Sequence, residues 1–146
     1  GDFVYTDSEV EAMLTDIGAA KKLGVSSFVL GALTSDRKLD QRVMQLLLAA
    51  CGEAEVVFHM AFDELAVTDQ LEAIEWLSIH GVARILTRAG SLDATLEQRF
   101  AHYHRLLAAA KGKIQILPGG GVTVENRALF LEQLRVCQLH GTRIVF

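Results

Sequence analysis

The sequence is poor in the residues that define disulfide-bonded and zinc-bound proteins. Its 146 residues include only two cysteines and one proline. Cys51 and Cys137 are far apart in the chain and belong to no C-x-x-C pair, and no histidines are clustered nearby. This pattern argues against a disulfide framework and a structural zinc site. We expect both cysteines to be buried, reduced thiols.

Long apolar runs and basic clusters are also missing. The stretch from Val43 to Cys51 is interrupted by Gln45 and is far shorter than the ~20 residues of a membrane span. The net charge is -4 and the 14 lysines and arginines are scattered, so no basic patch is present to neutralise nucleic-acid phosphates. No signal sequence opens the chain. We therefore expect a cytoplasmic protein with neither a nucleic-acid nor a membrane partner.

Four glycines recur about 30 residues apart, each after an amphipathic stretch in which apolar residues follow helical spacing. They are Gly24, Gly52, Gly81 and Gly112. A helix commonly ends in a left-handed residue, a conformation that costs glycine little. The glycines therefore predict the ends of four helices. The first helix carries the capping-box pair Thr6 and Glu9, which predicts a start near Asp7.

Short runs of β-branched and aliphatic residues follow the glycines and predict strands. They lack strict alternation, which is typical of parallel strands buried on both faces. The runs are Ser27 to Leu30, Val56 to Phe58, Arg84 to Thr87 and Ile114 to Leu117. The pattern also predicts a fifth helix from Val124 to about Val136 and a fifth strand from Arg143 to Phe146.

Alternation of helices and strands at this period predicts a parallel α/β fold. Five units fit a flavodoxin-like doubly wound sheet or part of a (β/α)8 TIM barrel, which needs roughly 250 residues when complete. The chain begins without methionine and stops inside an apolar run. On this ground we interpret residues 1–146 as a single domain, a partial segment of a TIM barrel with about five βα units, and expect N-terminal strands and a C-terminal tail outside it. Exposed strand edges would favour a homo-oligomer.

Candidate chemistry lies after the predicted strands, because loops at the carboxyl ends of parallel strands face the binding crevice. His59 and Asp63 follow one such strand and suit a general acid or base. The structural alternative is a hydrogen-bonded histidine, with Asp63 capping the next helix. Met60 adds a soft thioether, but neighbouring strand residues point to opposite faces, which argues against joint copper ligation by His59 and Met60.

A glycine-rich turn joins the fourth predicted strand to the fifth predicted helix. Successive glycines before a helix can present backbone N–H groups to a phosphate or carboxylate, so Gly119, Gly120 and Gly121 are candidate anion-binding residues. The spacing matches neither a Rossmann nor a Walker motif. A tight turn that requires positive φ explains the glycines equally well.

Further polar residues fall at the same predicted edge. The candidate residues of the barrel mouth are Asp2, Thr87, His140 and Thr142. His102 and His104 lie two apart on a predicted helix and share no face, so we expect both at the surface. The sequence assigns no metal ligand, so the identity of any metal-binding residue is unknown.

Taken in order along the chain, these segments resemble the CutC copper-homeostasis family. The resemblance is carried by Gly1 to Asp7, Phe58 to Asp63, Arg84 to Thr87, Gly119 to Val122 with Asn126, and His140 to Thr142. It implies a (β/α)8 barrel in which the first strands precede this chain. Met60 stands where arginine is common in the family and Arg88 where serine is common, so Arg88 is a candidate to restore the charge at an anion site.

The resemblance implies a role in copper homeostasis, with copper binding or trafficking and copper as a possible cofactor. The family's copper-associated cysteines lie in its opening segment, so no copper ligand carries over onto Cys51 or Cys137. The residues themselves also support a TIM-barrel enzyme acting on a small phosphorylated or carboxylated substrate. In that alternative, Gly119 to Gly121 and Arg88 bind the anion, and His59 or Asp63 transfers a proton. A noncatalytic scaffold is a third possibility.

Overall fold

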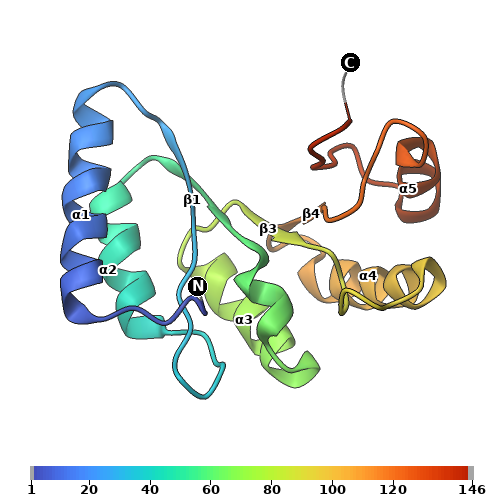
Figure 1. The fold of residues 1–146 in the computed structure, drawn as a ribbon, viewed down its shortest axis with the longest axis horizontal. Coiled ribbons are helices and arrows are strands. Elements are labelled where there is room, and N and C mark those ends of the chain that lie inside the picture. Colours follow the sequence, from blue (N-terminus) through green and yellow to red (C-terminus); the bar gives the residue numbers. More distant parts are fainter. Residues whose placement is uncertain (1, 145–146) are drawn as a thin grey trace.

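The computed structural model describes residues 2–144 as alternating helices and strands (Figure 1). The helices in that range are α1 (Asp7–Lys22), α2 (Gln41–Cys51), α3 (Val67–Ile79), α4 (Leu96–Ala110) and α5 (Arg127–Leu134), with a short 3-10 helix η1 (Met60–Glu64). The strands are β1 (Ser27–Leu30), β2 (Glu55–Phe58), β3 (Arg84–Thr87) and β4 (Gln115–Pro118). Over residues 2–144, none of the helices combines the length and apolar character that a bilayer span requires.

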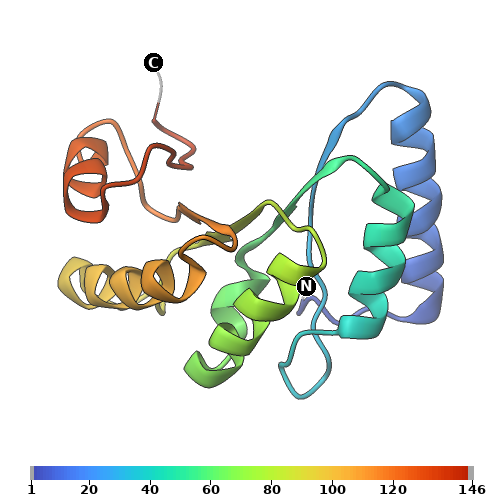
Figure 2. The same cartoon turned by 180° about the vertical axis from the view of Figure 1, so that it is seen from behind.

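The strands form one parallel sheet in the order β1-β2-β3-β4. Every strand pairs with the next strand along the chain, whereas a flavodoxin-like sheet has the order 2-1-3-4-5. In both Figure 1 and Figure 2, helices α1 to α4 follow one side of the arc that the strands form. The parallel α/β fold is therefore confirmed, and its winding is that of consecutive units in a barrel.

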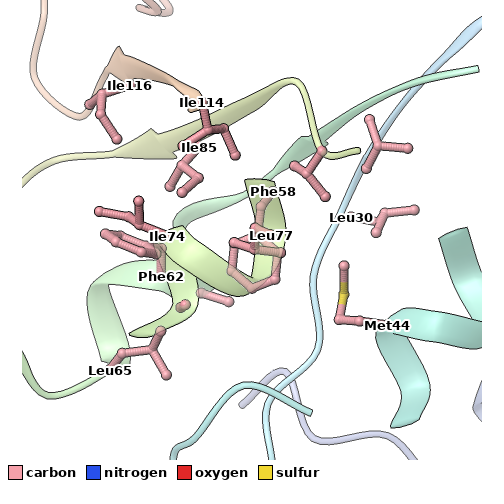
Figure 3. Packing of buried hydrophobic residues seen from close by; sticks show 14 of the residues in the cluster. Leu30, Met44, Phe58, Phe62, Leu65, Ile74, Leu77, Ile85, Ile114 and Ile116 are labelled. Carbon is pink, nitrogen blue, oxygen red and sulfur yellow. The ribbon is translucent and has the colours of Figure 1, made fainter. Parts of the chain in front are cut away.

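One face of the sheet packs against the helices. Phe58, Ile85 and Ile116 lie on this face of successive strands and are at most 2% exposed, and Figure 3 shows Ile85 close to Ile74 of α3. Each such side chain contributes about 2 kcal/mol when it is fully buried. The prediction that every strand is buried on both faces is wrong for β1, because Val29 on its other face is 64% exposed.

The predicted helix boundaries are largely confirmed. The four glycines each lie just beyond a helix, with φ angles of 88°, 62°, 80° and 73° along the chain. Helix α1 begins at Asp7 with a complete capping box: the Thr6 side chain accepts from Glu9 N, and Thr6 N donates to the Glu9 carboxylate at 2.7 Å.

The C-terminal part of the described chain differs from the prediction. Arg143 makes only an isolated parallel bridge to Thr123 in place of a fifth strand, and residues 145 and 146 of that predicted strand lie outside the described residues. Helix α5 is shorter than predicted, because Thr123 N donates to the Asn126 side chain in a turn and Arg135 adopts a left-handed φ of 52°. Cys137 is exposed, so the prediction that it is buried is wrong.

Thr6→Ala is expected to lower the free energy of unfolding by about 1 kcal/mol, because the Glu9 N–H loses its capping acceptor. Thr15→Ala is the matched control: it removes the same hydroxyl from the same helix, where that group donates only to Glu11 O. Urea denaturation followed by circular dichroism measures both variants. Equal losses in the two variants would contradict the capping role of Thr6.

Candidate functional site

The carboxyl ends of the four strands meet at one edge of the sheet, which we call the mouth. Leu30 at the end of β1 pairs with Phe58, and Thr87 at the end of β3 pairs with Pro118. The loops of the mouth therefore begin at Gly31, His59, Arg88 and Gly119. Because they leave the same edge, side chains from different loops can meet there.

His59 is tightly packed at the mouth. A Cβ atom at Gly31 would lie 2.8 Å from Cε1 of His59, and the centroid of the Phe3 ring lies 4.8 Å from that of the imidazole. Nδ1 accepts a hydrogen bond from Ala61 N at 3.2 Å, which leaves the proton of the neutral ring on Nε2. Burial lowers the pKa of His59. The neutral side chain can therefore donate a hydrogen bond from Nε2.

Asp63 ties η1 to the end of β3. Its Oδ1 accepts from Thr87 Oγ1 at 2.5 Å, and its Oδ2 accepts from Arg88 N at 3.0 Å. Asp63 is not a cap of α3, because the N-cap of that helix is Ala66, which makes no side-chain cap bond. Burial raises the pKa of Asp63, and the hydrogen bonds from Thr87 and Arg88 oppose that rise. Both carboxylate oxygens are thus engaged in positioning the loop after β3.

Arg88 is held through its backbone on both sides. Its N–H donates to Asp63, and its carbonyl accepts from Arg99 Nε at 2.7 Å. Within the side chain, Nε donates to Gly90 O at 2.9 Å, and Nη2 lies 3.7 Å from Glu64 Oε1. That last distance is an ion pair beyond hydrogen-bond range. The guanidinium is therefore fixed at Nε, while its terminal nitrogens retain donors for a ligand.

The glycine loop after β4 is clamped by Arg99 of α4. Arg99 Nη2 donates to the carbonyls of Gly119 and Gly120 at 3.0 and 2.7 Å. In a trans peptide the N–H points opposite to the preceding carbonyl, so the N–H groups of Gly120 and Gly121 point away from Arg99. Neither N–H has a protein acceptor among residues 2–144. Successive N–H groups without protein acceptors are the kind of backbone feature that can bind an anion.

Glycine is required where this loop approaches Arg88. Gly120 and Gly121 have φ angles of 67° and 79°, which residues other than glycine rarely adopt. A Cβ atom at Gly120 would also lie 2.7 Å from the Arg88 Cβ atom. The predicted anion-binding residues Arg88 and Gly120 are therefore in direct contact at the mouth.

The remaining predicted mouth residues take other roles. Thr87 is fully buried and its hydroxyl donates to Asp63, so it positions that carboxylate and does not face a ligand. His140 reaches the mouth through its backbone, whose N–H donates to Pro118 O at 2.8 Å, while its side chain is exposed. Asp2 and Thr142 are also exposed.

Sequence reasoning missed Arg99 and Tyr103 on α4. The buried Tyr103 hydroxyl donates to Thr87 O at 2.8 Å and lies 3.3 Å from Gly119 O. Burial raises the pKa of Tyr103 to about 12, so the hydroxyl stays protonated and can donate. The two side chains are four residues apart and share a helix face, a spacing that could have identified them together.

The prediction for His102 is wrong, whereas that for His104 is confirmed. His102 is half-buried, because α3 packs against α4 and its Nε2 lies 2.7 Å from Oε1 of the buried Gln70. His104 is exposed on the same helix.

The described residues do not fit a soft-metal site. Cu(I) favours thiolate and thioether ligands. Cys51 lies near Ser26, just before β1, and Cys137 lies near Gln115, the first residue of β4. Both cysteines are therefore at the edge of the sheet opposite the mouth. The Met60 methyl lies at Gly119 and Gly120, whereas the His59 ring lies against Gly31. Between residues 2 and 144, no three His, Cys, Asp or Glu side chains are arranged to hold a metal ion.

Fold and mouth together define a parallel α/β barrel segment with its candidate ligand-binding residues in the loops after the strands. The CutC family model matches residues 1–145. The chain belongs to the CutC family.

Known relatives support this membership. The chain is 43% identical over 145 residues to a CutC protein of Enterococcus faecalis and spans 69% of that protein. It is 39% identical over 140 residues to the copper homeostasis protein cutC homolog of Homo sapiens and spans 50% of it. The crystal structure of a CutC protein from Streptococcus agalactiae superposes with a TM-score of 0.94 at 39% identity, covering 99% of this chain and 69% of the other.

His59→Asn is expected to weaken the dependence of stability on pH. Because burial lowers the pKa of His59 in the folded protein, the stability of the wild-type chain is full above the unfolded value of about 6.5 and falls as the pH drops below it. Asparagine keeps a capping acceptor for Ala61 N but does not titrate. Urea denaturation between pH 8 and pH 5 measures the difference.

The exposed His104→Asn variant is the control and should retain the wild-type pH dependence. Stability will still depend on pH to some extent in His59→Asn, because burial lowers the pKa of His102 as well. Identical pH profiles for His59→Asn and wild type would rule out the partly buried, neutral state of His59.

Proposed function

We propose that this protein acts in copper homeostasis by binding a small anionic molecule, phosphorylated or carboxylated, at the mouth. The proposal is carried by two features at the mouth: the Arg88 guanidinium, fixed at Nε by Gly90 O, and the N–H groups of Gly120 and Gly121, which have no acceptor among residues 2–144, in a loop that packs against the Arg88 Cβ atom. Guanidinium and amide N–H groups both bind hard oxygen anions, and arginine can do so with two parallel hydrogen bonds. The names of the relatives support the copper-homeostasis part of the proposal.

An enzyme that acts on such an anion is the second candidate function. It is favoured by His59, whose Nδ1 is engaged and whose Nε2–H is free to donate at the end of the neighbouring strand. A hydrogen bond from Nε2 would stabilise negative charge that develops on a substrate oxygen. In this candidate function, Asp63 positions Arg88 rather than transferring a proton, because both of its oxygens already accept hydrogen bonds.

Direct copper binding or trafficking is proposed only with ligands beyond residues 2–144. Within that range the two thiols lie at the edge opposite the mouth. A copper ion remains a proposed partner of the whole protein, since the chain spans between 50% and 69% of the relatives named above.

A cytoplasmic location and self-association complete the proposal. The two cysteines are both free, which favours a reducing compartment. Strand β1 lies at an edge of the sheet and exposes Val29, and an exposed strand edge favours pairing with another chain.

Arg88→Gln is expected to weaken the binding of inorganic phosphate at least tenfold, because it removes the fixed guanidinium charge. Isothermal titration calorimetry at low salt measures the affinity, and the ¹⁵N shifts of Gly120 and Gly121 report on the glycine loop. Arg105→Gln removes an exposed arginine from α4 and is the matched control. Unchanged phosphate binding in Arg88→Gln would refute the proposed site.

Titration of the chain with Cu(I) against a competing chelator is expected to reveal only weak binding. That binding should disappear in Cys137→Ser, because Cys137 is the exposed thiol, and persist in Cys51→Ser, because Cys51 is fully buried. Tight binding by a variant that lacks both cysteines would mean that the residues of the mouth do form a copper site.

A further inference from the structure

Glu64 lies between two arginines that come from different loops of the mouth. Its Oε2 is 3.6 Å from Arg37 Nη1, and its Oε1 is 3.7 Å from Arg88 Nη2. Each carboxylate oxygen thus faces one guanidinium, and neither distance reaches hydrogen-bond range. Arg37 lies between β1 and α2, Glu64 ends η1, and Arg88 follows β3. Three segments of the mouth therefore converge at the Glu64 carboxylate.

Arg37 is presented by a tight turn. Its φ angle is 58°, a left-handed conformation that is uncommon for residues other than glycine and must be held by its surroundings. Arg37 N donates to Thr34 O at 2.9 Å, and Thr34 N donates to Lys38 O at 2.8 Å. The turn fixes the backbone, while the side chain remains 74% exposed. Its guanidinium is therefore available to a ligand.

A cavity of about 210 Å³ opens at this cluster. It is lined by Asp2, Phe3, Leu33, Arg37 and Glu64. Phe3 also contacts the imidazole of His59, so the cavity adjoins the histidine of the mouth. Its volume accommodates one small charged group beside the Glu64 carboxylate and the Arg37 guanidinium.

We infer that Glu64 is an internal anion that holds the place of a ligand's phosphoryl group between Arg37 and Arg88. This inference rests on the proposed function, because Arg88 belongs both to the proposed anion site and to the arginine pair around Glu64. The two guanidinium groups face the two oxygens of one carboxylate, so the ligand they fit concentrates its charge on a single group. A phosphate monoester does so with two negative charges, whereas a dicarboxylate separates them.

Displacement of the Glu64 carboxylate from the two arginines requires little free energy. Ion pairs between exposed side chains contribute weakly to stability, and the side chains of Arg37 and Glu64 are 74% and 38% exposed. Two guanidinium groups carry one charge more than Glu64 neutralises. A dianionic phosphate therefore matches the pair of arginines when Glu64 turns outward, whereas a monoanionic phosphate diester leaves one charge unmatched.

The test compares phenyl phosphate, a monoester, with dimethyl phosphate, a diester, by calorimetry at pH 7.5 and low salt. The wild-type chain is expected to bind phenyl phosphate at least tenfold more tightly. Glu64→Gln is expected to tighten phenyl phosphate binding about tenfold, because the internal competitor is gone. Glu132→Gln, which removes an exposed carboxylate from α5, makes the same charge change and should have no effect. Arg37→Gln is expected to reduce the preference for the monoester to about twofold.

Glu64→Asp is the second variant, since it keeps the charge but withdraws it from both arginines, and it should tighten binding about threefold. Equal affinities in wild type, Glu64→Gln and Glu64→Asp would overturn the inference and leave the Arg88 site standing. Weaker binding in both Glu64 variants would also overturn it. If no variant binds either probe, the proposed function itself fails and the inference fails with it.

Discussion

The mouth depends on the partly buried carboxylate of Asp63. This side chain accepts the Thr87 hydroxyl and the Arg88 N–H, so the segments after β2 and β3 are joined at one point. Buried donors left without this acceptor would cost about 1–3 kcal/mol each. The conformation of the loop after β3 is therefore set by a residue that follows β2, and the direction of the Arg88 side chain is set with it.

Arg99 and Arg88 have different roles in the proposed anion site. Arg99 uses its donors on the carbonyls of Arg88, Gly119 and Gly120, which turns the following N–H groups to the opposite side. Arg88 has only Nε bound to a carbonyl and keeps its terminal nitrogens for a ligand. One arginine organises the backbone from the helix side, and the other supplies charge at the mouth. Loss of either would disable the site for a different physical reason.

The sequence was most informative where structure depends on local pattern. Thr6 and the helix-ending glycines act through neighbouring backbone groups, so spacing alone located them. The predicted fifth strand failed because an apolar run becomes a strand only when a partner lies alongside it, and Arg143 meets its neighbour at a single bridge. The location of Arg88 and Gly120 at the mouth was predictable from their position after strands. The roles of Asp63 and Glu64 were not, because contacts between loops decide which donors or cations each carboxylate meets.

Copper binding and anion binding require different kinds of ligand from the chain. Cu(I) prefers sulfur, and the free thiols of residues 2–144 lie at the edge opposite the mouth. Oxygen anions prefer guanidinium and amide N–H groups, and these are what the mouth presents. A protein can alter copper levels by acting on a small anionic molecule without ligating the metal. The described residues therefore fit the proposed anion better than a copper ion.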